Sequence, residues 1–103
     1  MLILPKPVFF EWDKGNFDKN YQKHKVTNKE AEEVFDNEPK FIFEDKKHSE
    51  TEKRYGIFGR TKNGKLLSIV FIIRNNKIRI ITARNMSKKE RRLYEKIKIN
   101  PKI

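Results

Sequence analysis

The second half of the chain consists of β-branched apolar runs separated by short polar breaks. Three such runs lie between residues 55 and 83, and asparagine-containing dipeptides separate them. Asn63-Gly64 is the strongest short signal for a two-residue hairpin turn, and Asn75-Asn76 is a weaker signal of the same kind. This pattern predicts three consecutive antiparallel strands.

Two-residue turns would fix the register across these strands. Arg60 then falls opposite Leu67, and Leu67 falls opposite Arg84. Cross-strand partners share a face, so Arg60 and Arg84 are expected on one face, about 10 Å apart across two strand spacings. Arg79 is expected on the other face. The strand from Leu66 to Ile73 is apolar on both sides except at one serine, which predicts a central strand covered on both faces.

A short strand over residues 9–12 is expected to lead into the first helix. Asp13 suits the N-cap of that helix, because its carboxylate accepts free amides of the first turn. The helix is expected to run to about His24, with one apolar side formed by Phe17, Tyr21 and His24.

Capping boxes mark the starts of two further helices. Thr27 with Glu30 opens a helix, and its apolar stripe is Ala31, Val34 and Phe35. Ser87 with Glu90 opens a basic helix directly after the last strand. With a strand over residues 40–44, the element order is β-α-α-β-β-β-β-α. The expected class is α+β, a small and mostly antiparallel sheet packed with helices.

The junction between the last strand and the basic helix favours an anion. Arg84 stands at the end of the strand, three residues before Ser87. The first amides of a helix point toward this position and attract negative charge. A phosphate is therefore expected beside Arg84.

Composition limits the domain organisation and the cellular setting. The 103 residues predict one domain over 1–103, with residues 1–8 as an N-terminal extension and 97–103 as a C-terminal tail. The absence of cysteine excludes a disulfide scaffold or a thiolate metal site. Apolar runs are far shorter than the ~20 residues of a membrane span. We expect a soluble, cytoplasmic protein that does not bind membranes.

The net charge of +11 is unevenly distributed. Residues 1–52 carry 9 Lys and Arg against 12 Asp and Glu, whereas residues 53–103 carry 16 against 2. The two halves therefore differ in net charge, −3 against +14. A strongly basic half attracts polyanions with a steep salt dependence. RNA, DNA and an acidic protein partner are all compatible with this charge.

Several classes of chemistry have little support in the sequence. His24 and His48 are distant in sequence, and no zinc-protease, phosphate-loop or serine-nucleophile motif is present. No metal or other cofactor is therefore expected. Metal-free RNA cleavage remains, because arginine forks match phosphate oxygens, and histidine, lysine or tyrosine can move protons.

Candidate residues for that chemistry come from both halves of the chain. The candidate catalytic residues are Arg60, Arg84, His24, Lys23 and Arg79. The candidate RNA-binding residues are Lys88, Lys89, Arg91, Arg92 and Tyr94. Each has a structural alternative: Arg60 and Arg84 could cap the core and pair with Glu11 or Asp13. His24 and Tyr94 could be packed side chains.

A set of short motifs, spread in order over residues 9 to 96, resembles the BrnT toxin family. These are Phe10-Glu11-Trp12-Asp13, Lys23-His24-x-Val26, Ala31-x-x-Val34-Phe35-Asp36, His48-Ser49-Glu50-x-x-x-Arg54-Tyr55, Gly59-Arg60, Arg79-Ile80-Ile81-Thr82-Ala83-Arg84 and Glu90-Arg91-x-x-Tyr94-Glu95. The chain departs from the family pattern at two positions. Thr82 stands in place of a serine, and Lys25 stands in place of a glycine.

The resemblance implies a toxin of a type II toxin–antitoxin system with a RelE-like fold. It implies a ribonuclease that blocks translation and is neutralised by a BrnA-like ribbon-helix-helix antitoxin. DNA would be bound only through the toxin–antitoxin complex. Carried onto matching positions, it favours Lys23, His24, Arg60, Arg79 and Arg84. A non-catalytic RNA-binding module and a protein-interaction subunit are the alternatives.

Overall fold

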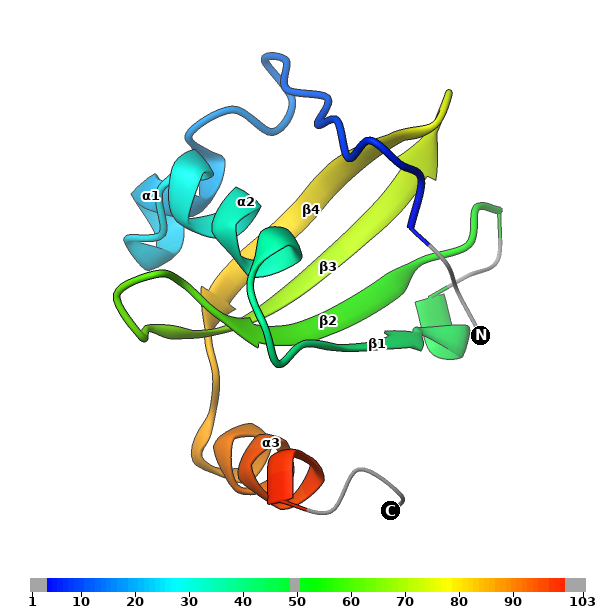
Figure 1. Cartoon of the computed structure of the whole chain (residues 1–103). Coiled ribbons are helices and arrows are strands. Elements are labelled where there is room, and N and C mark those ends of the chain that lie inside the picture. The colour runs from blue at the N-terminus through cyan, green and yellow to red at the C-terminus, as the bar shows by residue number, and fades with distance from the viewer. Residues whose placement is uncertain (1–3, 49–50, 100–103) are drawn as a thin grey trace.

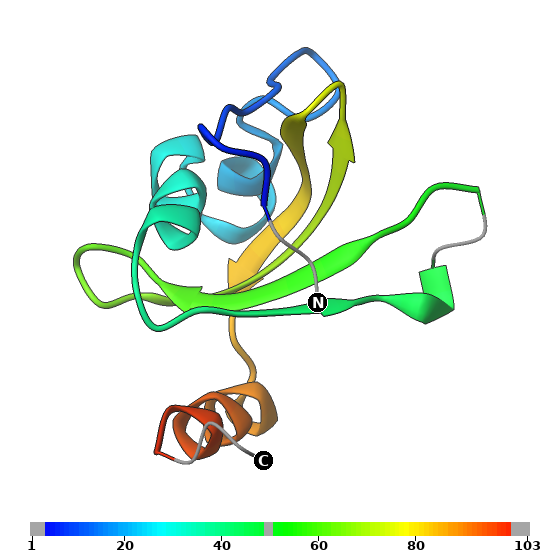
Figure 2. The same cartoon turned by 45° about the vertical axis from the view of Figure 1, so that its right-hand side comes forward.

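The computed structural model describes residues 4–48 and 51–99, which form one antiparallel sheet with helices on both faces (Figure 1). The elements are α1 (Lys19–His24), α2 (Asn28–Asp36), β1 (Phe41–Glu44), the short 3-10 helix η1 (Lys46–His48), β2 (Tyr55–Arg60), β3 (Leu66–Arg74), β4 (Lys77–Asn85) and α3 (Lys88–Ile99). The strand order is β1-β2-β3-β4. Figure 2 shows α1 and α2 over one face, here the inner face, and α3 against the other, the outer face. The expected α+β class is confirmed.

The expected first strand over residues 9–12 is reduced to one parallel bridge. Phe10 pairs with Ile78 at the edge of β4, and the backbone of Ile78 makes two hydrogen bonds of 2.8 Å to the residues flanking Phe10. The chain then turns away, because the carbonyl of Asp13 accepts the N–H of Phe17 at 2.8 Å. This turn ends the pairing before a strand can form.

The first helix begins at Lys19 and not directly after Asp13 as expected. Asp18 precedes it with a φ of 57°, and this left-handed conformation interrupts the helix. Phe17 and Tyr21 are 56% and 47% exposed, so the expected apolar side does not reach the core. The apolar spacing was therefore misleading at this helix.

Two buried asparagines attach α1 to the sheet instead. The Asn16 amide donates to the carbonyl of Ile80 at 3.2 Å, and the Asn20 side-chain carbonyl accepts the N–H of Ala83 at 2.9 Å. These bonds satisfy backbone groups on the open edge of β4, which would otherwise be free to pair with another chain. α1 is thereby held along β4.

The second helix follows its sequence signals. Thr27 Oγ1 accepts the N–H of Glu30 at 3.0 Å, and the Glu30 carboxylate accepts the N–H of Thr27 at 2.9 Å. The expected stripe is buried: Ala31, Val34 and Phe35. A Cβ at Gly59 would lie 2.7 Å from the Val34 side chain, so β2 approaches α2 closely only because residue 59 is glycine.

The turn between β2 and β3 differs from the expected two-residue turn. Gly64 adopts a φ of 85° while Asn63 does not take a positive φ, and three residues, 62–64, lie between Thr61 and Lys65, whose backbones are joined by a hydrogen bond of 2.9 Å. This is the loop in which a type I turn is followed by a left-handed glycine. The register moves by one residue, so Arg60 pairs with Leu66 and not with Leu67.

The turn between β3 and β4 is as expected, but the ladder changes register beyond it. Asn75 and Asn76 both have positive φ, which is the two-residue type I′ geometry. The register then shifts between Val70 and Phe71, leaving Ile81 as the extra residue of a β-bulge in β4. Beyond the bulge, Arg84 pairs with Ser68.

The sheet has a large core on its inner face and a small one on its outer face. The inner core includes Leu4 from the expected N-terminal extension and side chains of α2 and all four strands. The outer core contains Phe58, Met86 and Tyr94, with Phe41 and Leu66 packed against them. β3 is thus central, but α3 covers its outer side only in part.

Candidate phosphate-binding face

Arg60 and Arg84 share the outer face, as expected, although through a different register. Their partners Leu66 and Ser68 are two residues apart on β3 and so point the same way. The longer β2–β3 loop and the bulge each shift the register by one residue, and the two shifts preserve the shared face. The arginines are displaced diagonally, with Cα atoms about 12 Å apart by strand geometry.

The bulge also brings Arg79 to the outer face, where it was not expected. Arg79 pairs with Ile72, which has the same orientation on β3 as Ser68. Its guanidinium binds Asp13 at 2.8 and 2.9 Å and Glu11 at 2.9 Å. Only 13% of the side chain is exposed. Arg79 therefore pairs with the two carboxylates considered for the other arginines and anchors the N-terminal segment.

Glu90 occupies the place where a phosphate was expected. Its two carboxylate oxygens accept Nη1 and Nη2 of Arg84 at 2.7 and 2.9 Å, and one of them also accepts the N–H of Ser87 at 2.9 Å. Ser87 Oγ accepts the N–H of Glu90 at 3.2 Å, which confirms the capping box. A charged fork and a helix amide converge on one anion, as they would on a phosphate.

The same contacts lower the pKa of the Glu90 carboxyl. The Arg84 guanidinium, assisted by the amide of Ser87, lowers the pKa of Glu90 to about 2, although partial burial opposes this. The pKa of Arg84 is raised by its hydrogen bonds to Glu90. Both groups are therefore charged throughout the physiological range.

Acid is expected to weaken the fold through this pair. The folded-state pKa of Glu90 lies below its unfolded value, so the stabilisation is complete above about pH 4.5 and is lost as the pH falls toward 2. We expect the free energy of unfolding to lose about 2 kcal/mol over this range. Urea denaturation at steps from pH 5 to pH 2 measures the loss. The Glu90→Gln variant should lack this pH-dependent loss. If the free energy of unfolding falls with pH equally in both proteins, Glu90 is not its cause.

Arg60 is exposed at the end of β2. Its Nε donates to the carbonyl of Glu38 at 3.0 Å, and within the described part of the chain it makes no ion pair with a carboxylate. It lies near Tyr94: burial raises the pKa of that phenol, and the positive charge of Arg60 opposes the rise. Arg60 is therefore more available to an incoming anion than Arg84 or Arg79.

The side chain of Tyr94 lies on the side of α3 that faces the sheet and not on the exposed side of the helix. The side chain is completely buried, its hydroxyl donates to the carbonyl of Pro39 at 2.8 Å, and its ring packs edge-on against Phe41. Contact between this ring and RNA would require α3 to move. The other expected RNA-binding residues are exposed on α3: Lys88, Lys89, Arg91 and Arg92.

Lys23 and His24 lie at the end of α1. Asn20 of α1 binds the N–H of Ala83, and His24 lies about one helical turn after Asn20 at the end of the helix. Lys23 is exposed and His24 is half-buried. Among the described residues, no hydrogen bond or ion pair joins either one to the arginines of the outer face.

Lys25, which replaces the glycine of the family pattern, terminates α1 in a left-handed conformation with a φ of 59°. This conformation costs a non-glycine residue about 1 kcal/mol. We expect Lys25→Gly to raise the free energy of unfolding by about 0.5–1 kcal/mol, measured by urea denaturation. Lys25→Ala is the control, since it removes the charge but keeps the Cβ. Equal effects of the two substitutions would show that backbone strain is not the cause.

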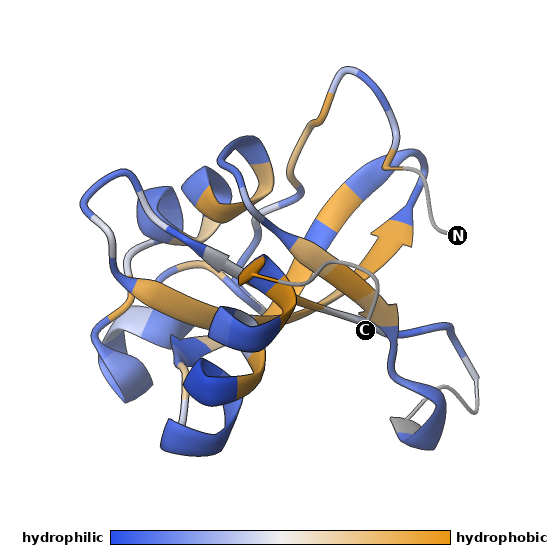
Figure 3. Cartoon of the chain, turned by 60° about the horizontal axis from the view of Figure 1, so that its bottom comes forward, coloured by the Kyte–Doolittle hydropathy of each residue, from blue (hydrophilic) through white to orange (hydrophobic). Residues whose placement is uncertain are grey.

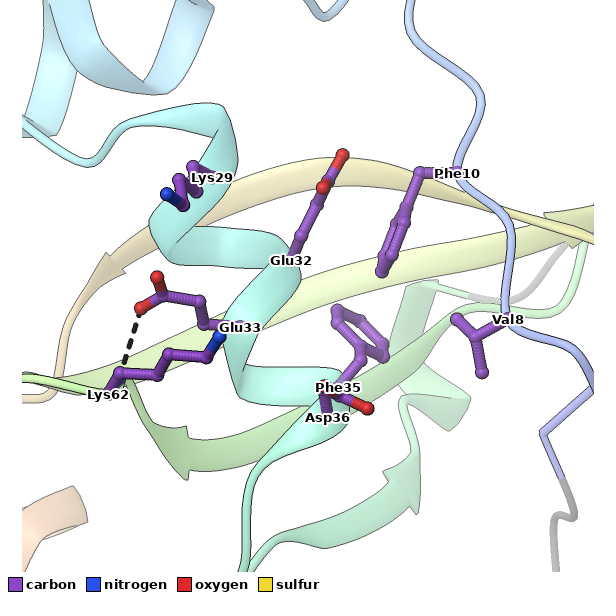
Figure 4. A pocket seen from close by; sticks show the side chains of 8 residues that line it. All are labelled: Val8, Phe10, Lys29, Glu32, Glu33, Phe35, Asp36 and Lys62. Carbon is purple, nitrogen blue, oxygen red and sulfur yellow. Dashed lines mark hydrogen bonds between the residues drawn. The ribbon is translucent and has the colours of Figure 1, made fainter.

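A hollow on the other side of the molecule has the wrong charge for RNA. It has a volume of about 340 Å³ and lies between α2 and the N-terminal segment, with Phe10 and Phe35 in its wall (Figure 4). Its lining includes three carboxylates, Glu32, Glu33 and Asp36, and two lysines, Lys29 and Lys62. The carboxylates outnumber the lysines by one, so this hollow disfavours phosphates and the outer face remains the candidate site.

Two features of the site were missed by sequence reasoning. Glu90 was identified as a helix cap and Arg84 as an anion ligand, yet their spacing also allows them to pair with each other. Asn16 and Asn20 gave no apolar signal. The one sequence indication of this attachment of α1 to β4 is that the two asparagines are spaced four residues apart.

The described residues also bear on metal and membrane binding. Across residues 4–48 and 51–99, no three side chains of His, Cys, Asp or Glu gather as a metal site. None of the helices described is long and apolar enough to span a membrane.

The sheet and its outer-face arginines define a small cationic α+β protein suited to bind phosphate groups. A sequence model of the ribonuclease toxin BrnT of type II toxin–antitoxin systems matches residues 12–90. The chain belongs to the BrnT family, and so to the ribonuclease toxins of these systems. A comparison with curated proteins gives no match.

Proposed function

We propose that the protein is a metal-independent endoribonuclease that inhibits translation in the cytoplasm. Family membership supplies the class, a ribonuclease toxin. The observation that carries the finer proposal is that Arg60 and Arg84 share one sheet face beside a basic helix. A RelE-like fold belongs to the same proposal.

Arginines suit the central step of metal-free RNA cleavage. When the 2′-oxygen attacks the phosphorus, a pentacovalent phosphorane with additional negative charge forms. Arg60 and Arg84 would stabilise that charge with oriented N–H groups that stay protonated at any working pH. Lys23 or His24 would carry a proton to or from the reacting oxygens.

Substrate binding would then be an exchange of anions. In the free protein Glu90 holds the Arg84 fork. An RNA phosphate offers the same kind of acceptor oxygens and would replace the carboxylate. Binding therefore requires this ion pair to open, and the exposed cations of α3 would favour the exchange by raising the local concentration of RNA.

The experiment that tests this function compares two strands of identical sequence. One is labelled RNA, and the other carries 2′-deoxy linkages, both incubated with metal-free protein in EDTA. We expect cleavage of the RNA only. Cleavage of both strands, or cleavage abolished by EDTA, would overturn the mechanism. Binding without cleavage, even when ribosomes are added, would favour the non-catalytic RNA-binding module.

The antitoxin is proposed to be a BrnA-like ribbon-helix-helix protein. Type II systems pair the toxin with a protein antitoxin, and the family match therefore implies such a partner. Co-expression with a BrnA-like ribbon-helix-helix protein should give a stable complex without RNA cleavage. DNA binding is expected for the complex and not for the toxin alone.

A further inference from the structure

The outer face contains a second region, beyond the part that α3 covers. Figure 3 shows α3 across one portion of this face and the strands continuing past it without a helix above them. A hollow of about 410 Å³ lies there, bordered by β3, β4 and the segment before β2. Its size is within the range of small-ligand pockets.

The floor of this hollow is apolar. Ile72 comes from β3, and Ile81 is the extra residue that the β-bulge adds to β4. Bulges often re-aim a side chain next to a functional site. Here the bulge supplies an apolar wall and also brings Arg79 and Arg84 onto the same face.

The rim of the hollow is mostly cationic. Lys47, Arg54 and Arg74 line it together with one carboxylate, Glu52. Arg74 binds Glu52 at 3.0 and 3.1 Å, but the two side chains are 48% and 39% exposed. An exposed pair of this kind contributes little to stability and exchanges easily. The positive excess suits a phosphate.

The hollow lies on the same strand as Arg84 of the proposed cleavage site. Arg84 and Arg79 are five residues apart on β4, about 15 Å along the strand, and Ile81 lies between them. A nucleic-acid strand that follows β4 away from Arg84 therefore reaches the hollow. In the hollow beside α2, by contrast, three carboxylates outnumber two lysines.

We infer that this outer-face hollow binds a nucleotide of single-stranded RNA next to the cleaved phosphate. The base packs against the half-buried Ile81, with the buried Ile72 beneath it, and its phosphate contacts Lys47 and Arg74. The inference rests on the proposed function, because it takes RNA as the substrate. A basic groove that follows the phosphates binds single strands without sequence preference, and here an aliphatic side chain stands where other such proteins use an aromatic ring.

The test measures binding to an uncleavable 2′-O-methyl RNA by fluorescence anisotropy, so that catalysis plays no part. Lys47→Glu is expected to weaken binding at least fivefold more than Lys29→Glu, which makes the same charge change on an exposed lysine of α2. Lys47→Ala should reduce the slope of log affinity against log salt by about 0.7, the value for one lost phosphate contact. If Lys47→Glu and Lys29→Glu weaken RNA binding equally, the loss of affinity comes from the change in net charge alone, and the inference is overturned.

An RNA strand with one abasic position tests whether the hollow binds a base. As the abasic position is moved along the strand, the affinity of the wild-type protein should fall most at one position. In Ile81→Ser this position-specific loss of affinity should disappear. Uniform binding along the series overturns the inference while leaving the proposed function intact. A wild-type protein that binds no RNA overturns both. Circular dichroism confirms that each variant is folded.

Discussion

Replacement of Arg84 by alanine is expected to lower the rate of RNA cleavage by about 100-fold or more, the effect of removing an oriented donor to a developing oxyanion. The loss should fall mainly on the cleavage step, since the extra charge of the phosphorane exists only in the transition state. Single-turnover cleavage with saturating protein measures this step separately from binding. The fold should persist, because Glu90 keeps the amide of Ser87 as a partner.

Two control variants separate charge from geometry at this position. Arg84→Lys keeps the charge but loses the fork that holds two oxygens, so its cleavage rate should stay well below that of the wild type. Glu90→Gln leaves Arg84 in place and removes its competing carboxylate, so RNA should bind more tightly. Unchanged cleavage by folded Arg84→Ala would show that the arginine is not part of the catalytic site.

The shared face of Arg60 and Arg84 was predicted from the sequence, but by a register that the structure corrects twice. A glycine in a left-handed conformation lengthens the first loop, and a bulge adds a residue to β4. Alternation along a strand has a period of two, so each one-residue shift alone would have reversed the relative orientation. Because both shifts occur, Arg60 and Arg84 again point to the same side of the sheet.

Arg79 shows why the rest of the site could not be predicted. Nothing in the alternation of residues 77–85 indicates a bulge, because apolar side chains at Ile80 and Ile81 suit either face. The capping boxes, by contrast, depend on local spacing, and both were found in the structure. The capping boxes are therefore readable from the sequence, whereas the register across strands depends on a longer loop and a bulge that it does not mark.

The attachment of α3 is expected to depend on Tyr94 more than on any other residue. The ring is completely buried in the small outer core with Phe58 and Met86. Tyr94→Ala should lower the free energy of unfolding by about 3–5 kcal/mol, the usual cost of deleting a buried aromatic ring. Urea denaturation measures this loss. Hydrogen exchange should become faster across residues 88–99 in particular, because few other side chains hold the helix to the sheet.

Tyr94→Phe is the matched control, because it keeps the ring and removes only the hydroxyl that binds the carbonyl of Pro39. Its cost should be about 1 kcal/mol, with α3 still protected from exchange. RNA affinity should be unchanged in this variant if the hydroxyl has only a structural role. A large loss of RNA affinity in folded Tyr94→Phe would mean that α3 moves and presents the phenol to the substrate. The outer core would then be part of the binding site and not only its support.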